Sequence, residues 1–288
     1  MSQKINFVKM HGLGNDFVVL DRITQFFPIN RSLIKKIGDR NLGIGCDQIL
    51  IVDPPTHPEH DFNYRIFNAN GKEVEQCGNG ARCFGRYIYE KGLSEKNILT
   101  VGCLSGTIQI DISTPNHITA NIGQPQSPVK NKDFKIHKLK EISAGRYRIA
   151  IQKTHKEVQL ISLGNPHCVL SVPSLKETNV ASIGRTLQNH PCFPQGINVS
   201  FVELLARNHI KVKVYERGAG ETQACGSAAA ASVIAGIQQK ELNHSVQVDM
   251  PGGSLSVEWP DGNVGVSISG PTSSVFEGRF LLSQAAPM

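Results

Sequence analysis

The chain lacks the cysteine spacing of a disulfide scaffold or a zinc ribbon. Its 288 residues include seven cysteines, an odd number, and no two of them form a CxxC pair. A disulfide framework needs paired cysteines, and a zinc ribbon binds its metal through two such pairs. We therefore expect reduced thiols that are available for chemistry.

Long apolar runs and targeting signals are also missing. The longest nearly uncharged apolar stretch, residues 224–237, is too short and too rich in Ala, Gly and Ser to span a bilayer. Neither end carries a secretory, retention or prenylation motif, so we expect a cytoplasmic protein with no membrane partner. With 40% apolar and 19% charged residues, the composition is that of an ordinary globular chain. Its length suffices for about two domains.

Positive charge is concentrated in one segment. The formal net charge is +6, and residues 130–156 hold nine Lys or Arg against two acidic residues, which leaves the remainder close to neutral. Tyr147, Ile149 and Ile151 alternate with Arg146 and Arg148, as in a strand with one solvated face. No aromatic series suited to base stacking accompanies the charge. We therefore expect a solvated face and no nucleic-acid partner, with a polyanion site as the alternative.

An internal repeat is the clearest organisational signal. Gly14-Asn15 resembles Gly164-Asn165, and Gln48 aligns with Asn198, both at an offset of 150 residues. Three further matches follow in the same order: residues 64–80 with 211–227, 105–110 with 252–257, and Gly123 with Gly270. Chance similarity of Gly-rich turns is the alternative, but collinear matches over most of both halves indicate a duplication.

Each half shows the same order of predicted elements. A helix follows each Cys-Gly pair, at residues 79–90 and 227–239, and two strands are expected after each helix. The remaining predicted strands cover residues 6–10, 17–20, 48–52, 63–67, 159–163, 168–172, 199–204 and 210–215. This order predicts an α+β fold of two pseudo-symmetric domains, each a mostly antiparallel sheet or barrel wrapped around a central helix. Residues 1–125 and 126–271 are the expected halves.

Cys77 and Cys225 both lie where a Gly-rich loop enters a predicted helix. The exposed N–H groups and the positive end of the helix dipole should lower the pKa of each thiol and attract an anion. A thiolate and a thiol are what a stereochemical inversion needs, because a base removes a proton from one face of a carbon and an acid returns one to the other. Such a reaction requires no pyridoxal cofactor, and we expect none.

The other cysteines are expected to be packing residues. They are Cys46, Cys83, Cys103, Cys168 and Cys192. In a reduced protein, most cysteines are small buried residues that pack like other apolar side chains. His190 and Cys192 resemble a metal-binding pair only loosely, so no metal site is predicted.

Three motifs in order resemble the diaminopimelate epimerase family over essentially the whole chain. They are CGNGAR at 77–82, GNPH at 164–167 and ERGAGETQACGS at 216–227, with HGLGNDF at 11–17 in addition. The resemblance implies a cofactor-independent isomerase of lysine and peptidoglycan precursor synthesis. It would interconvert L,L-diaminopimelate and meso-diaminopimelate, with Cys77 and Cys225 as acid and base between two similar domains. A homodimer, and a tail at 272–288 that returns to the first half, are also implied.

The resemblance implies a role for each polar residue near these cysteines. Those that would hold the carboxylate at the reacting end are Gly78, Asn79, Gly226 and Ser227. Those that would line the rest of the pocket are Asn15, Gln48, Asn68, Asn165, Asn198, Glu216 and Arg217. Arg217 suits the distal carboxylate and Glu216 the distal ammonium. His167 and Glu216 would help to set the protonation and placement of the thiols.

Three positions depart from the family pattern. Asn70 and Lys72 stand where an acidic residue and then Ser or Thr are usual, and Ala228 stands where Gly is common. None is a proposed ligand, so the departures concern local turn geometry.

Three other functions are alternatives to this one. A proline racemase would share the chemistry, but its first motif typically has His at the position of Asn79, and its substrate offers Arg217 no distal carboxylate. A polyanion-binding protein would use residues 130–156 and show salt-dependent binding. A thiol redox protein would need the missing CxxC pair.

Overall fold

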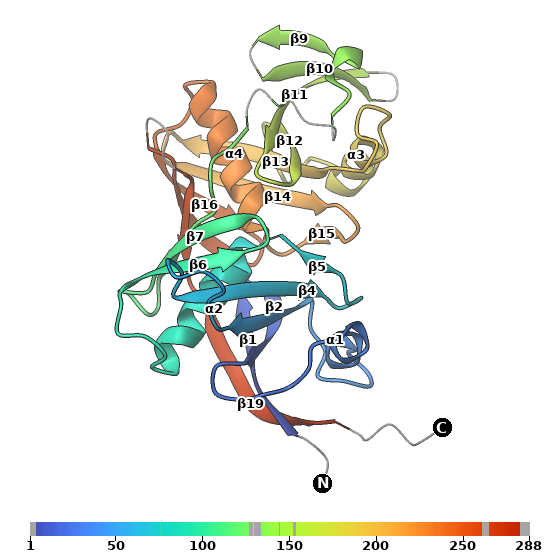
Figure 1. The fold of residues 1–288 in the computed structure, drawn as a ribbon. Coiled ribbons are helices and arrows are strands. Elements are labelled where there is room, and N and C mark those ends of the chain that lie inside the picture. The colour runs from blue at the N-terminus through green and yellow to red at the C-terminus, as the bar shows by residue number, and fades with distance from the viewer. Residues whose placement is uncertain are drawn as a thin grey trace. The chain divides into compact units, whose positions relative to one another are not determined.

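The computed structural model describes residues 4–75, 77–126, 129, 134–143, 145–151, 154–260 and 265–282. By its internal contacts the chain forms two compact units (Figure 1). Unit 1 comprises residues 1–120 and 270–288, and unit 2 comprises residues 121–269. Part of the basic segment, including Lys130, Lys132 and Lys153, lies outside the described residues.

Unit 1 is a mostly antiparallel sheet with two helices. Its strands are β1 (Lys4–Gly12), β2 (Asn15–Asp21), β3 (Gln48–Asp53), β4 (Phe62–Asn68), β5 (Glu73–Val74), β6 (Ile98–Cys103), β7 (Gly106–Asp111), β8 (Ile118–Asn121) and β19 (Ser273–Leu281). Neighbouring pairs are antiparallel except β2–β3 and β4–β6. Parallel strands need a crossover. Helix α1 (Arg31–Gly38) lies in the first crossover and α2 (Gly78–Glu90) in the second.

Unit 2 repeats this order. Its strands are β9 (Lys140–Ser143), β10 (Arg146–Ile151), β11 (Thr154–Ser162), β12 (Pro166–Ser171), β13 (Asn198–Ala206), β14 (His209–Glu216), β15 (Gly220–Thr222), β16 (Ser245–Met250), β17 (Gly253–Glu258) and β18 (Ser267–Gly270). The parallel pairs are again two, β12–β13 and β14–β16. Helices α3 (Val180–Gln188) and α4 (Gly226–Gln238) lie in the two crossovers, and a short 3₁₀ helix covers Ile136–Lys138.

The repeat extends to the strand register. Phe17 pairs with Gln48 across β2 and β3, and His167 pairs with Asn198 across β12 and β13. Both members of the second pair lie 150 residues after those of the first, the offset already found in the sequence. The predicted α+β fold of two pseudo-symmetric units is confirmed.

A central helix fills the core of each unit. Helix α2 packs against β1, β2 and β7, and α4 packs against β11, β12, β13 and β17. Phe84 of α2 meets Tyr64 edge to face with ring centroids 5.2 Å apart. A Cβ on Gly80 would come within 2.5 Å of Tyr64 Oη, so this position of α2 needs glycine to pack closely against β4. The prediction of a sheet wrapped around a central helix is therefore confirmed for both units.

The sequence prediction was wrong on two points. Helices α1 and α3 were not predicted, and three strands rather than two follow each central helix. Asn30 and Asn179 cap the missed helices by accepting from the backbone N–H groups of Leu33 and Ser182. At eight and nine residues, these helices are too short for apolar periodicity to show clearly.

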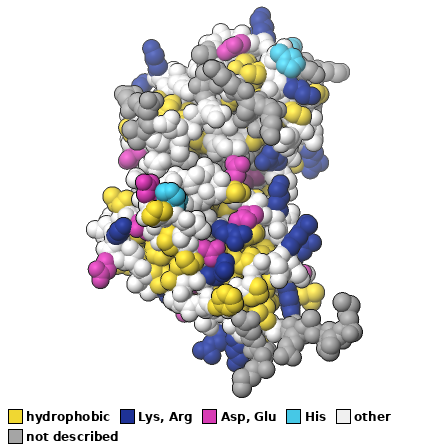
Figure 2. Space-filling view, in the orientation of Figure 1, with side chains coloured by type: hydrophobic (Ala, Val, Ile, Leu, Met, Phe, Trp, Pro, Cys, Tyr) yellow, Lys and Arg dark blue, Asp and Glu magenta, His cyan; other side chains and the backbone are white. Residues whose placement is uncertain are grey.

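The described part of the basic segment forms an ion-paired strand face. Tyr147, Ile149 and Ile151 of β10 are buried, as predicted. Glu157 of β11 pairs with both Arg146 and Arg148, with N–O distances of 2.7 and 3.3 Å. On the face drawn in Figure 2, Lys and Arg side chains lie interspersed with Asp and Glu. No helix within the described ranges is long and apolar enough to cross a membrane.

The remaining cysteines are packed as predicted. Cys46, Cys83, Cys168 and Cys192 are buried and Cys103 is half-buried. Burial raises the pKa of the Cys46 thiol to about 12, and it raises those of Cys83 and Cys168 still further. These thiols are therefore poor nucleophiles.

Candidate functional site

Cys77 is the N-cap residue of α2. Its backbone is extended (φ −143°, ψ 122°), and its carbonyl accepts from Ala81 N–H at 2.8 Å in the first helical hydrogen bond. The amides of residues 78–80 therefore have no acceptor within the helix and point out of its positive end. Tyr64 Oη also donates to the Cys77 carbonyl, at 3.4 Å, which ties the start of α2 to β4.

Asn15 and Asn79, two of the predicted polar residues, lie next to this thiol, and two others pair with each other in the same unit. Asn15 Oδ1 lies 3.6 Å from Cys77 Sγ and 3.4 Å from Asn79 Nδ2. Gln48 and Asn68 form a direct pair across β3 and β4, with Nε2 donating to Oδ1 at 2.9 Å. Unit 1 thus supplies a half-buried thiol beside open helix amides and amide side chains, whose N–H groups can donate to a carboxylate.

Unit 2 repeats the arrangement with different side chains. Cys225 is the N-cap residue of α4, with an extended backbone (φ −137°, ψ 112°). Its Sγ lies 3.5 Å from Ser227 Oγ, to which Asn165 Nδ2 donates at 3.2 Å. His167 Nε2 lies 2.8 Å from Asn165 Oδ1. A polar chain therefore runs from His167 through Asn165 and Ser227 to the thiol.

His167 is neutral in this site. The ring is fully buried in β12, and burial, assisted by the charge of Arg217, lowers its pKa from 6.5 to about 3. Because an amide oxygen can only accept a hydrogen bond, the neutral ring is protonated at Nε2, and this N–H donates to Asn165 Oδ1. The resemblance implied that His167 helps to place the thiol. The hydrogen bonds to Asn165 and Ser227 provide a route for such an effect.

Glu216 and Arg217 follow directly at the end of β14. Thr222 Oγ1 donates to Glu216 Oε1, and Gln188 Nε2 donates to the Glu216 carbonyl at 3.0 Å. Asn198 Oδ1 accepts from the backbone N–H of Arg217 at 2.9 Å. Asn198 thus positions the chain at Arg217, and the lining role that the resemblance implied stays a prediction.

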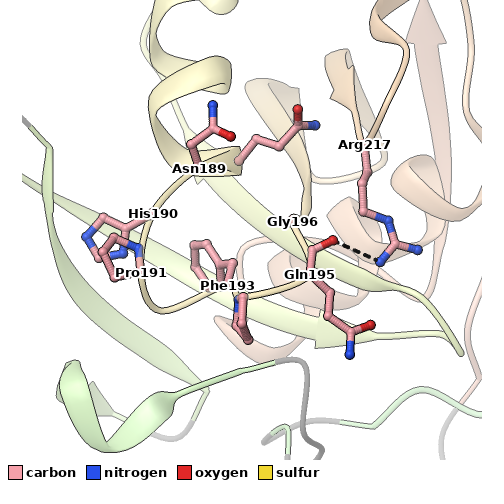
Figure 3. A pocket seen from close by; sticks show the side chains of 9 residues that line it. Asn189, His190, Pro191, Phe193, Gln195, Gly196 and Arg217 are labelled. Atoms are coloured by element: carbon pink, nitrogen blue, oxygen red, sulfur yellow. Dashed lines mark hydrogen bonds between the residues drawn. The ribbon is translucent and has the colours of Figure 1, made fainter.

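The guanidinium of Arg217 borders a pocket of about 390 Å³ (Figure 3). The other lining residues belong to the segment 188–196, which runs from the last residue of α3 into the loop before β13. Arg217 is exposed, and its Nη1 donates to the Gln195 carbonyl at 3.5 Å. Gly196 has φ +74°, and a Cβ there would lie 3.2 Å from Arg217 Cγ, so glycine leaves room for the arginine. An exposed guanidinium beside a pocket is suited to a second carboxylate.

The departures from the family pattern leave the turns intact. Asn70 Oδ1 accepts from Lys72 N–H at 2.9 Å and closes the turn between β4 and β5, where Gly71 has φ +81°. Ala228 is buried in the first turn of α4, and its carbonyl accepts from Ser232 Oγ at 2.7 Å.

Two polar residues that the sequence prediction missed bond the amide side chains next to Cys77. Asp47 Oδ2 accepts from Asn15 Nδ2 at 3.0 Å, and Arg82 Nη2 donates to Asn79 Oδ1 at 2.9 Å. Arg82 stands in the quoted CGNGAR motif, and a cation near the start of a helix opposes the dipole. That conflict was a signal available from the sequence. Within the described residues, no three His, Cys, Asp or Glu side chains cluster as metal ligands.

Comparison with known proteins places the chain in a family. The sequence profile described as diaminopimelate epimerase matches residues 7–128 and 159–274. The chain belongs to the diaminopimelate epimerase family. Proteins named diaminopimelate epimerase from Ectopseudomonas mendocina (strain ymp) and Azotobacter vinelandii (strain DJ / ATCC BAA-1303) are each 44% identical over 278 residues. Those alignments cover 96% of this chain and 99% of each relative. The family predicted from the motifs is confirmed.

Solved structures at lower identity share the fold of this epimerase family member. A hydroxyproline epimerase from Agrobacterium vitis matches with a TM-score of 0.72 at 13% identity, covering 98% of this chain and 93% of that one. A PhzF-family phenazine biosynthesis protein from Bacillus anthracis matches with a TM-score of 0.67 at 18% identity, covering 97% and 100%. Both comparisons support the α+β two-domain fold.

Proposed function

We propose that this chain is a cofactor-independent epimerase that interconverts L,L-diaminopimelate and meso-diaminopimelate in lysine and peptidoglycan precursor synthesis. One observation carries the proposal. Cys77 and Cys225 are the N-cap residues of equivalent helices in a duplicated fold, and the chain belongs to the diaminopimelate epimerase family. An inversion needs two acid–base groups, and the duplication supplies two of the same kind.

In this mechanism one cysteine is a thiolate and the other a thiol. The thiolate takes the proton from the α-carbon of one stereoisomer, and the thiol returns a proton to the opposite face. The substrate's α-carboxylate would lie on the open helix amides at Gly78, Asn79, Gly226 and Ser227. The positive ends of α2 and α4 would there stabilise the negative charge of the carbanion-like transition state.

The distal end of the substrate would bind near β14. Arg217 is the proposed partner of the second carboxylate and Glu216 that of the second ammonium, with Asn15, Gln48, Asn68, Asn165 and Asn198 lining or shaping the pocket. The proposal is supported by the exposed guanidinium beside the pocket of about 390 Å³. Selection for two carboxylates distinguishes this function from racemisation of a mono-carboxylate amino acid.

Isotope exchange tests substrate and reaction together. The purified protein is incubated with L,L-diaminopimelate in heavy water, and the α-carbon signals are followed by NMR. We expect one deuterium to enter as the meso isomer forms, because the returned proton comes from a solvent-equilibrated thiol. Formation of the meso isomer without deuterium, or no conversion at all, would contradict the proposal.

We also infer that the protein acts as a homodimer in the cytoplasm. Apolar side chains stand exposed along β19, among them Val275, Phe276 and Leu281. Exposed apolar side chains on one strand support a protein interface. Sedimentation velocity at micromolar concentration should give a dimer, and a monomer there would contradict the inference.

A further inference from the structure

We propose that Asp47 and Arg82 are positioning residues that fix the direction of the Asn15 and Asn79 amides at Cys77. The inference rests on the proposed function, because it concerns how the reacting end of the substrate is bound. Neither residue is among the site residues that the resemblance implied. Both act through another side chain rather than on the substrate.

The four side chains form one line of hydrogen bonds. Arg82 Nη2 donates to Asn79 Oδ1 at 2.9 Å, and Asn79 Nδ2 donates to Asn15 Oδ1 at 3.4 Å. Asn15 Nδ2 then donates to Asp47 Oδ2 at 3.0 Å. Arg40 Nη2 and the backbone N–H of Asp16 hold the same carboxylate, at 2.8 and 3.1 Å.

The residues at the two ends of this line, Arg82 and Asp47, determine how the two amide groups between them are oriented. A guanidinium can only donate and a carboxylate can only accept, whereas an amide side chain can do either. With Arg82 at one end and Asp47 at the other, each amide has a single orientation that satisfies all the bonds. Asn15 therefore turns its oxygen toward Cys77 Sγ, and Asn79 turns its NH₂ group toward that same oxygen.

That orientation suits an anionic ligand. The Asn79 NH₂ group has two hydrogens, of which Asn15 uses one, so the second can join the helix amides in donating to a carboxylate. A reversed Asn79 would present an oxygen at the same place and repel the carboxylate. The line thus keeps a donor where the proposed mechanism needs one.

Arg82 is costly for the fold, which supports a role in the site. The side chain is fully buried near the start of α2, and Nε has no hydrogen-bond partner among the described residues. Its other donor, Nη1, bonds the Gly78 carbonyl at 3.2 Å, and none of the described carboxylates pairs with it. A buried unpaired cation near a helix N-terminus is unfavourable on both counts.

Unit 2 shows that the fold does not require these charges. The positions equivalent to Asp47 and Arg82 by the offsets of 150 and 148 are Ile197 and Ala230. Both are buried in the same strand–helix framework. There the Asn165 amide is held by His167 instead, at 2.8 Å. The charged line is thus particular to the Cys77 site.

Steady-state kinetics with L,L-diaminopimelate tests the proposal on three variants. Arg82→Met removes the donor, Arg82→Lys keeps a cation that can only donate, and Asp47→Asn replaces the acceptor by a side chain that can face either way. We expect KM to rise about ten-fold or more for Arg82→Met and Asp47→Asn, because each loses a bond that orients a ligand group. The KM of Arg82→Lys should lie much closer to that of the parent than to that of Arg82→Met.

The melting temperature separates positioning from folding. Arg82→Met should melt close to the parent, because removal of an unpaired buried charge offsets the loss of its bonds to Asn79 Oδ1 and the Gly78 carbonyl. Arg86→Met is the matched control on the same helix, where Arg86 pairs with Glu90 at 2.6 Å, and its KM should equal that of the parent. Asp47 is about half exposed, so Asp47→Asn tests the proposal even if Arg82→Met fails to fold.

Parent kinetic constants in Asp47→Asn, or in folded Arg82→Met, would overturn the proposal. A KM as high in Arg82→Lys as in Arg82→Met would also do so. The side-chain amide NMR signals of Asn15 and Asn79 supply a readout without substrate, and we expect Asp47→Asn and Arg82→Met to shift both. If the parent fails to epimerise diaminopimelate but these signals shift, the proposed function fails and the positioning role stands.

Discussion

His167 Nε2 lies 2.8 Å from Asn165 Oδ1, and the same amide donates from Nδ2 to Ser227 Oγ. Ser227 is the residue that meets Cys225 Sγ, at 3.5 Å. Because the ring is neutral, its influence on the thiol passes through a hydrogen-bonded amide and hydroxyl rather than through a charge. This relationship makes His167 a positioning residue in the proposed mechanism.

The pH dependence of stability should reveal the buried neutral ring. The pKa of His167 in the folded protein, about 3, is below its ordinary value of 6.5, so protonation favours the unfolded state. Its contribution to the free energy of unfolding is intact above pH 6.5 and is lost progressively as the pH falls toward 3. We expect urea unfolding between pH 7 and 4 to show a steeper loss in the parent than in His167→Gln. Equal slopes would contradict the buried neutral ring.

Each of the two thiols proposed as acid and base should be indispensable. We expect Cys77→Ala and Cys225→Ala each to lower the rate of inversion by at least about a thousand-fold, because neither residue can serve the face of the other. Circular dichroism should show that both variants keep the fold. Cys103→Ala is the control, since it is also half-buried yet has no proposed role. Inversion near the parent rate in either folded variant would refute the two-thiol mechanism.

Arg217 should determine substrate choice. We expect Arg217→Met to cost about 2 to 5 kcal/mol in transition-state binding of diaminopimelate, the range for truncating one partner of a charge pair that closes on its ligand. Arg207→Met is the control, because Arg207 is an exposed arginine of the same unit whose hydrogen bonds go to Lys240 and Asn243. The measurement is kcat/KM. A parent enzyme that racemises alanine or proline as well as it epimerises diaminopimelate would remove the distal-site assignment.

The sequence predicts the central elements better than the connections. Helix α2 was expected at 79–90 and begins one residue earlier, since a Cys-Gly pair before an apolar run marks a helix start clearly. Helix α1 was missed because its apolar residues, Leu33, Ile34 and Ile37, cover barely two turns. The register of β2 on β3 was not predicted, but it recurs 150 residues later in β12 on β13, because duplicated segments pair alike.

In the candidate site, too, the sequence predicts the residues of local motifs better than the contacts between distant segments. Motif spacing places Cys77 and Cys225 where a Gly-rich loop enters a helix, and the structure makes each of them the N-cap residue. Asp47 and Arg82 lie 35 residues apart in the sequence and meet through Asn15 and Asn79. Such a line forms only when β2, β3 and α2 come together, so the position of Arg82 at a helix start could draw attention to that residue but not to its connection with Asp47.

Helix α4 has almost no solvent-exposed surface, and this determines how its backbone amides should exchange with solvent. Ten of its thirteen residues are buried, including the whole run from Ala228 to Gly236. Opening a single turn would expose apolar side chains all round, so its backbone amides should exchange with heavy water only when the unit unfolds as a whole. Strand β9 is exposed at all four residues and should exchange early. Native-state hydrogen exchange at α4 should therefore report the free energy of global unfolding. A helix that opens only on global unfolding would hold the Cys225 thiol at its N-terminus in a fixed position.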